Sequence, residues 1–252
     1  MALLTNVILD QLLNHTSIRH FQAKPLTKEQ VQTLIEAAQH ASTSTFSQQY
    51  SIVSVTDPDV KAQLADITGH HWLVNSGHFF VMVADQYRNL QIAKAHNTDP
   101  YILHTTDKFL ASVFDTAIAT QNIMVAAESM GLGGTIMGSI LNDSKRVIDL
   151  LDLPELTFPL LGLAIGYPAD QPEIKPRLPQ AEMHFDGSYK LPTDFNAQLA
   201  EYDADVANYY GSRSSNDRIE SFSHHIVAEL GRSHEVRKEL LATIKRQGFL
   251  LD

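Results

Sequence analysis

The residues best suited to chemistry in this sequence are cations in loops, where they could hold a phosphate group. Arg19 ends the polar stretch 15–19, and Lys175-Pro176-Arg177 stands in a segment made rigid by prolines. A guanidinium binds two phosphate oxygens at once, whereas an ammonium acts as a point charge. Each of these cations, taken alone, is also an ordinary surface residue.

A polar run between residues 42 and 48 could line a small-molecule site. It contains Ser42, Thr43, Ser44 and Thr45, and Gln48 follows shortly after. Hydroxyl and amide groups of this kind can bind a cofactor, but the same composition is typical of a surface loop without a function. Both interpretations stay open at this point.

Several other chemistries lack their motifs. The sequence has no cysteine, which excludes disulfides, thiolate nucleophiles and cysteine-bound metals. It has no G-x-S-x-G elbow, no Walker A motif and no H-E-x-x-H motif, because His234-Glu235 lacks the second histidine. The pairs His70-His71 and His224-His225 are adjacent in the chain, and adjacent side chains do not face each other. We therefore expect no metal site.

Composition predicts an acidic globular protein of one or two domains. The 252 residues carry 19 Lys plus Arg against 29 Asp plus Glu, a formal charge of −10, and 44% of them are hydrophobic. A nucleic-acid partner needs clustered cations, and the sequence has no basic stripe. No apolar run reaches the roughly 20 residues of a membrane span, and no basic region marks a secretory signal. We expect a cytoplasmic protein with no nucleic-acid and no membrane partner.

The elements that must position these residues are helices around a sheet of at least four strands. Apolar spacing predicts helices over residues 3–13, 107–130 and 142–151, a helix that starts at a Thr27/Gln30 capping box, and helical patterns over 195–209 and 234–245. Strands are predicted over residues 50–56, 79–83, 133–140 and 158–167. Between Pro168 and Pro179 the prolines predict a fixed surface arm.

The glycines at 131, 133 and 134 do not form a dinucleotide fingerprint. That motif must follow a strand and open a helix, whereas these glycines end one helix and begin a strand. Gly131 instead stands where a left-handed glycine ends a helix.

Taken together and in this order, the segments resemble the NADPH-dependent, oxygen-insensitive group (group A) of the nitroreductase and flavin reductase family. The resemblance runs from about residue 14 to residue 218. It is carried by six separate blocks, at residues 15–21, 41–48, 115–122, 126–134, 161–168 and 175–179.

The resemblance implies an α+β, nitroreductase-like fold with a central, mostly antiparallel sheet flanked by helices. It also implies a domain-swapped homodimer with a C-terminal excursion, in which each active site lies at the subunit interface and holds one tightly bound FMN. We expect residues 1–252 to form a single FMN-binding domain, with residues 205–252 as a C-terminal helical extension.

The resemblance also assigns residues to the site. FMN is expected to contact His15, Thr16, Ser17, Arg19, Thr43, Gln48, His71, Ile136, Met137, Gly138, Ser139, Lys175 and Arg177. Arg213 and Arg218 are expected to bind the 2′-phosphate of NADPH. Family members often have an aromatic residue and two glycines over 136–139, and a glutamine where this chain has His71.

The function that the resemblance implies is an FMN-dependent NADPH oxidoreductase. It would reduce nitroaromatics, quinones, azo compounds or free flavin by two electrons with ping-pong kinetics, and the flavin would carry the chemistry, so no catalytic side chain is expected. One alternative is a non-catalytic flavin-binding sensor or storage protein, and another is a ligand-free helical interaction protein. Rapid bleaching of the yellow protein by NADPH distinguishes the enzyme from both.

Overall fold

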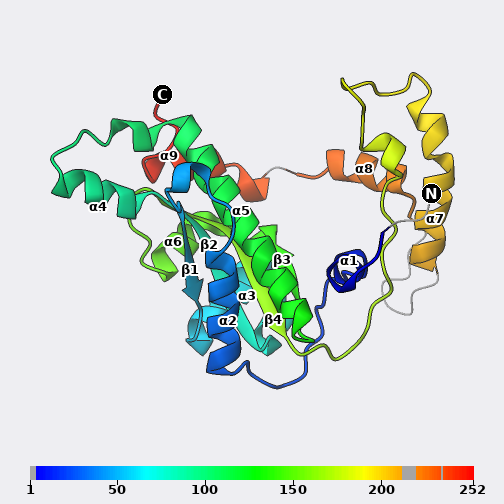
Figure 1. Ribbon diagram of the computed structural model, residues 1–252, viewed down its shortest axis with the longest axis horizontal. Helices are drawn as coiled ribbons and strands as arrows, with labels where there is room; N and C mark the ends of the chain where they lie inside the picture. Colours follow the sequence, from blue (N-terminus) through cyan, green and yellow to red (C-terminus); the bar gives the residue numbers. More distant parts are fainter. Residues whose placement is uncertain (1–3, 212–219, 234) are drawn as a thin grey trace. The chain divides into compact units, whose positions relative to one another are not determined.

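The computed structural model describes residues 4–211, 220–233 and 235–252. The chain divides into two compact units, a first unit of Met1–Pro172 with Glu235–Asp252 and a second unit of Glu173–His234 (Figure 1). The first unit thus begins and ends the chain, and the second is an insertion near its C-terminal end. The expected single domain with an extension at 205–252 stays a prediction.

The first unit contains a four-stranded sheet in the order β1-β2-β4-β3, and every neighbouring pair is antiparallel. Its strands are β1 (Tyr50–Ser54), β2 (His78–Asp85), β3 (Gly133–Met137) and β4 (Thr157–Gly166). Its helices are α1 (Val7–Leu13), α2 (Lys28–Gln39), α3 (Pro58–Thr68), α4 (Tyr87–Ala95), α5 (Thr106–Ser129), α6 (Ser144–Leu150) and α9 (Leu240–Arg246). The predicted antiparallel sheet with flanking helices is confirmed.

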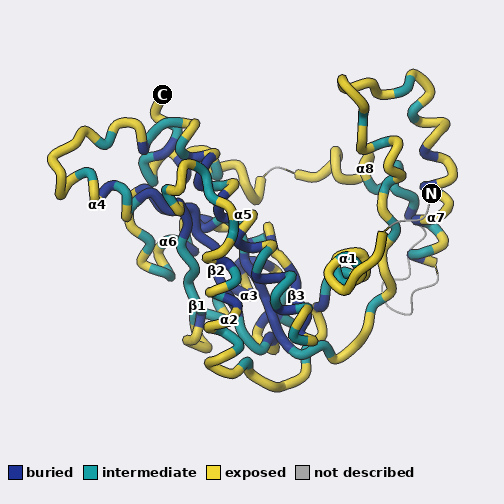
Figure 2. The backbone as a smooth tube through the Cα atoms, in the orientation of Figure 1, coloured by how far each residue is buried: buried dark blue, intermediate teal, exposed yellow. Residues whose placement is uncertain are grey.

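Both faces of the sheet are covered, which explains the continuous apolar run of β2. Phe80 packs with Leu34 of α2 and Ile123 of α5 on one face. Its neighbour Phe79 packs on the other face, with Leu64 of α3. Both phenylalanines are fully buried because successive side chains of a strand point to opposite faces. Figure 2 shows these central strands as the most buried part of the first unit.

The helix α5 is the longest element of the described chain and contains buried polar residues among its apolar ones. Thr105 caps its start, and Gly131, with φ of 72°, follows its end in the predicted left-handed conformation. Among the described residues it is the one helix long and apolar enough to cross a membrane, but a core helix passes the same test, and 44% of its most apolar window is buried inside the protein.

Close packing explains the glycines that begin β3. A Cβ atom on Gly133 would lie 2.4 Å from the Ile18 side chain, and one on Gly134 would lie 2.4 Å from the carbonyl oxygen of Ala164. Glycine therefore lets residues 17–18 and β4 approach β3 from two directions.

Some predicted boundaries are wrong. The strand predicted over 133–140 ends at Met137, where the chain turns into the 3₁₀ helix η4 (Gly138–Asp143), and the following helix is the shorter α6. The first helix begins at Val7 after the cap Asn6, whereas it was expected from residue 3, which lies outside the described residues. The helix predicted over 234–245 divides into η6 (Glu235–Arg237) and α9.

The second unit has a small core of its own. Its helices are α7 (Phe195–Gly211) and α8 (Phe222–Leu230), and α7 buries Leu199, Tyr202, Val206 and Tyr210. The proline-spaced arm enters this unit without regular structure over residues 171–179. The Tyr202 hydroxyl donates a hydrogen bond to the carbonyl oxygen of Pro176 over 3.3 Å, which fastens the arm to α7.

Candidate functional site

The segment from His15 to Arg19 is attached along β3. The backbone N–H of Ile18 donates to the carbonyl oxygen of Gly134 over 2.9 Å, and Ser17 forms a parallel bridge with Gly134. The Thr135 hydroxyl donates to the carbonyl oxygen of Ile18 over 2.6 Å. Because Ile18 is buried, the alternating residues on either side of it point the other way.

This attachment leaves the polar residues of the segment available. His15 Nδ1 lies 2.5 Å from the Glu128 carboxylate of α5, so one ring nitrogen is held by the protein and Nε2 is left for another partner. Arg19 is exposed, and its guanidinium has no hydrogen bond or ion pair within the part of the chain that the structure describes. Ser17, Thr16 and His15 are half-buried. The segment therefore presents both an open cation and a fixed imidazole.

The end of β3 adds a second group of predicted residues. Ile136 is 38% exposed, Met137 is buried, and Gly138 has open space where a side chain would stand. The Ser139 hydroxyl oxygen is buried and has no hydrogen-bond partner among the described residues. An unsatisfied buried hydroxyl is rare in folded proteins.

The positive charge of Arg19 affects the pKa of His70. Burial lowers the pKa of His70, and the positive charge of Arg19 lowers it further. His70 also lies over Trp72, with 5.5 Å between ring centroids. His71, the residue predicted to contact FMN, is exposed, and its Nδ1 stands 3.7 Å from an Asp66 carboxylate oxygen. The contact of His71 with FMN stays a prediction.

The predicted residues Thr43 and Gln48 lie in a loop between α2 and β1. The 3₁₀ helix η1 (Ser44–Phe46) lies between them. Asp115 of α5 accepts hydrogen bonds from the backbone N–H groups of Ser44 and Gln49, so this loop is fastened to α5. Sequence reasoning did not name Asp115 as a site residue, although a carboxylate inside an apolar helix pattern was a signal for it.

The remaining predicted cations lie elsewhere in the chain. Lys175 and Arg177 belong to the second unit, where Lys175 Nζ stands 5.3 Å from the ring centroid of Tyr210 and Arg177 donates to the carbonyl oxygen of Lys175 over 2.8 Å. Their meeting with the first unit's residues stays a prediction. Arg213 and Arg218 lie outside the described residues. Within the described chain, no group of three or more His, Asp or Glu side chains could hold a metal ion.

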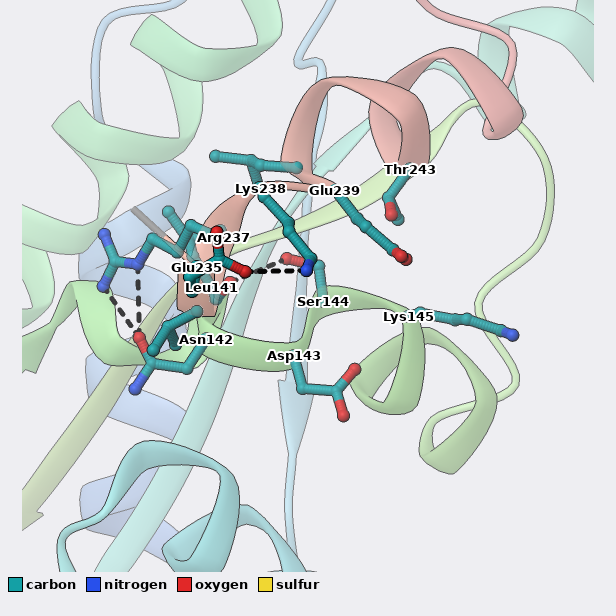
Figure 3. A pocket seen from close by; sticks show the side chains of 12 residues that line it. Leu141, Asn142, Asp143, Ser144, Lys145, Glu235, Arg237, Lys238, Glu239 and Thr243 are labelled. Carbon is teal, nitrogen blue, oxygen red and sulfur yellow. Dashed lines mark hydrogen bonds and ion pairs between the residues drawn. The ribbon is translucent and has the colours of Figure 1, made fainter. Parts of the chain in front are cut away.

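The returning C-terminal segment reaches the end of β3 through Arg237. Its guanidinium donates to the carbonyl oxygen of Gly138 over 3.0 Å, and through Nε and Nη2 to the side-chain oxygen of Asn142 over 3.2 and 3.0 Å. Figure 3 shows the contact of Arg237 with Asn142 and the ion pair of Lys238 with Glu235, and these four residues line a cavity of about 260 Å³. Sequence reasoning missed Arg237, because its partners are 95 and 99 residues away along the chain.

Comparison with known proteins identifies the class that this fold and site define. The family model described as "Nitroreductase family" matches residues 12–167 of this chain. A second family model, described as "Nitroreductase family, C-terminal domain", matches residues 175–252. The chain belongs to the nitroreductase family.

Individual relatives are similar over nearly the whole chain. A Bacillus subtilis (strain 168) protein named FMN reductase (NADPH) is 38% identical over 247 residues, which cover 97% of this chain and 98% of that protein. The solved NfrA1 nitroreductase from B. subtilis superposes with a TM-score of 0.92 at 38% identity and covers 97% and 100% of the two chains. The NADPH:FMN oxidoreductase from Vibrio harveyi, solved in complex with NAD⁺, has a TM-score of 0.85 at 32% identity, covering 98% and 100%.

Proposed function

We propose that this protein is an FMN-dependent NADPH oxidoreductase. The observation that supports the proposal is the attachment of residues 15–19 along β3, which leaves Arg19 exposed and without an ion pair among the described residues, while Glu128 holds His15. Arg19 is thus a cation without an ion-pair partner among the described residues, and the imidazole of His15 keeps one ring nitrogen for a ligand. Together they fit a ligand with a phosphate group and a polar ring.

FMN fits this donor set. Arg19 offers a fork for phosphate oxygens, His15 is held at Nδ1 by Glu128 and keeps Nε2 for a second contact, and the space beside the Gly138 backbone is open. We propose that Thr16, Ser17, Thr43, Gln48, His71, Ile136 and Met137, with Lys175 and Arg177 of the second unit, complete the set. When bound, FMN accepts a hydride from the nicotinamide and passes two electrons to a second substrate.

The electron donor in this proposal is NADPH. The relatives' names support it, because one is an FMN reductase (NADPH) and another an NADPH:FMN oxidoreductase. We assign recognition of the 2′-phosphate to Arg213 and Arg218. As acceptors we propose planar aromatic compounds, namely nitroaromatics, quinones, azo compounds or free flavin, because an aromatic acceptor needs little more than a flat slot over the flavin.

We further propose that the enzyme is a cytoplasmic, domain-swapped homodimer. Its long helix α5 supports the dimer, since Leu110, Phe114 and Ile118 are 44%, 57% and 43% exposed at a spacing of four residues. An exposed apolar stripe of this kind on a core helix suits a partner subunit.

Steady-state kinetics test the proposed function. If the donor product leaves before the acceptor enters, double-reciprocal plots at several acceptor concentrations give parallel lines. Intersecting lines would contradict a mechanism in which the electron donor and the acceptor occupy the same cavity one after the other. A protein that binds FMN but shows no NADPH oxidation with any of the four acceptor classes would instead be the flavin sensor or store.

A further inference from the structure

The loop between α2 and β1 holds an unfavourable backbone conformation. Thr45, Phe46 and Gln48 have φ of 52°, 58° and 48°, a left-handed region that residues with side chains rarely adopt. Thr45 is β-branched and the least suited of the three. Such residues keep this conformation only when their surroundings hold it.

A single carboxylate holds both ends of this stretch. The backbone N–H of Ser44 donates to Asp115 Oδ1 over 2.7 Å, and the backbone N–H of Gln49 donates to Asp115 Oδ2 over 3.0 Å. Asp115 is 1% exposed, so water does not compete for these bonds. Hydrogen bonds to an ionised acceptor are about twice as strong as neutral ones.

Buried amide groups fix the orientation of this arrangement. Gln49 Nε2 lies 3.3 Å from both Asp115 Oδ2 and the carbonyl oxygen of Ser44. Gln86 Nε2 donates to Gln49 Oε1 over 2.5 Å and to the carbonyl oxygen of Lys108 over 3.1 Å. From the open side, Arg88 donates to the carbonyl oxygen of Gln48 over 3.0 Å. The loop is therefore tied to α5 and to the segment that follows β2.

We propose that Asp115 is a positioning residue for the flavin site. It holds the loop of residues 43–48, in which Thr45, Phe46 and Gln48 are left-handed, so that Thr43 and Gln48 meet FMN already arranged and little ordering remains to oppose binding. This inference rests on the proposed function, because that function makes Thr43 and Gln48 flavin contacts. In this proposal Asp115 does not contact FMN. It binds the loop, and the loop binds FMN.

The substitution Asp115→Asn tests the claim at nearly constant shape. It replaces one carboxylate oxygen by an NH₂ group, so a donor then faces a backbone N–H at one end of the loop. We expect the Kd for FMN to rise about tenfold or more. Thr116→Val is the matched control, since Thr116 is adjacent, fully buried, and donates its hydroxyl only within α5, to the Ser112 carbonyl oxygen over 2.6 Å. It should change the Kd by less than about twofold.

Hydrogen exchange gives a readout that does not depend on FMN. In the flavin-free wild-type protein the Ser44 and Gln49 amides should be protected, and Asp115→Asn should make them exchange at least about tenfold faster. Unprotected amides in the wild type would overturn the inference. If the wild type bound no FMN, the proposed function would fail, while the exchange rates would still decide whether Asp115 holds the loop.

A second substitution tests the conformational step. Glycine adopts positive φ without a steric penalty, so Thr45→Gly added to Asp115→Asn should recover FMN affinity by about threefold or more. A general disturbance of α5 would not respond to a change in the loop. Wild-type affinity in Asp115→Asn, an equal loss in Thr116→Val, or no recovery in the double variant would each overturn the inference.

Discussion

Arg237 donates a hydrogen bond to the carbonyl oxygen of Gly138 over 3.0 Å and so joins the last part of the chain to the end of β3. The same guanidinium holds the side-chain oxygen of Asn142, so it fastens η4 near both of its ends. Residues 138 and 139 are predicted flavin contacts. The C-terminal segment therefore fixes the backbone that would carry them.

Replacing Arg237 should weaken FMN binding. Arg237→Ala frees the Gly138 carbonyl and Asn142 together, and we expect the Kd for FMN to rise several-fold, or by about 1 kcal/mol. Arg237→Lys should recover only part, because an ammonium cannot reproduce a planar fork. The neighbouring Lys238→Ala removes an exposed ion pair with Glu235 and serves as the control. Flavin fluorescence titration measures the Kd for FMN of all three variants. If Arg237→Ala bound FMN as tightly as Lys238→Ala does, Arg237 would have no role in the FMN site.

The phosphate contact of Arg19 predicts a larger effect. Loss of one hydrogen bond to a charged group costs about 1.5–3 kcal/mol, so Arg19→Ala should bind FMN at least several-fold more weakly. Lys24→Ala is the control, because Lys24 is an exposed cation of the same segment that stands 3.8 Å from the Tyr167 ring centroid. The same titration compares the two variants. An unchanged Kd in Arg19→Ala would remove this residue from the FMN site.

The exposed stripe of α5 predicts the oligomeric state. Phe114→Glu should convert the dimer into a monomer and release flavin, because a charge cannot be buried there without a partner. Ile92→Glu on α4 is the matched control, since Ile92 is 59% exposed and Phe114 57%. Analytical ultracentrifugation with absorbance at flavin wavelengths follows both changes at once. A wild-type monomer that retains FMN at micromolar concentration would refute the interface.

The two arginines assigned to NADPH predict a selective loss. Arg213→Ala combined with Arg218→Ala should lower kcat/KM for NADPH and leave the value for NADH nearly unchanged, because only NADPH carries the 2′-phosphate. Both constants come from initial rates with one acceptor held fixed. Equal losses with the two nucleotides, or a wild-type enzyme indifferent between them, would show that these residues do not read the phosphate.

The partly buried His78 predicts a loss of stability in mild acid. Burial, with a smaller contribution from the charge of Lys61, lowers the pKa of His78 to about 4 from its ordinary 6.5. The unfolded chain therefore binds a proton at His78 below about pH 6.5, whereas the folded chain binds it only near pH 4. The free energy of unfolding thus keeps its full value above about pH 6.5 and decreases as the pH falls from 6.5 to 4.

The expected size of this loss is about 1–2 kcal/mol at pH 5, after a reduction for partial exposure to solvent. Urea unfolding at pH 7 and pH 5 measures it. His78→Asn should lose less stability on acidification than the wild type does, while His40→Asn, at an exposed histidine, should follow the wild type. If the wild type and both variants lost the same stability between pH 7 and pH 5, His78 would bind its proton as readily in the folded as in the unfolded chain, which would contradict the lowered pKa.

Local sequence patterns predicted the elements of the core, since each depends on residues a few positions apart. The apolar spacing of α5, the capping box at Thr27 and the left-handed Gly131 are confirmed. The pattern over 133–140 failed at its end because Ile140 is buried from a 3₁₀ helix, where an apolar side chain looks the same in sequence as one in a strand.

Long-range contacts could not be predicted from local patterns. Asp115 binds backbone groups 71 and 66 residues away, and those groups carry no sequence signature, because every residue except proline has a backbone N–H. Arg237 and Gly138 pose the same problem over 99 residues. The resemblance to a family supplied the site residues, but not the carboxylate that holds the loop between two of them.

Anaerobic mixing of the purified, FMN-loaded protein with NADPH tests the central claim most directly. We expect one equivalent of NADPH to bleach the yellow flavin absorbance rapidly and NADH to bleach it more slowly, and we expect the absorbance to return when a quinone or nitroaromatic compound is added. A protein that retains no FMN after reconstitution, or whose bound flavin keeps its absorbance in the presence of excess NADPH, would contradict it.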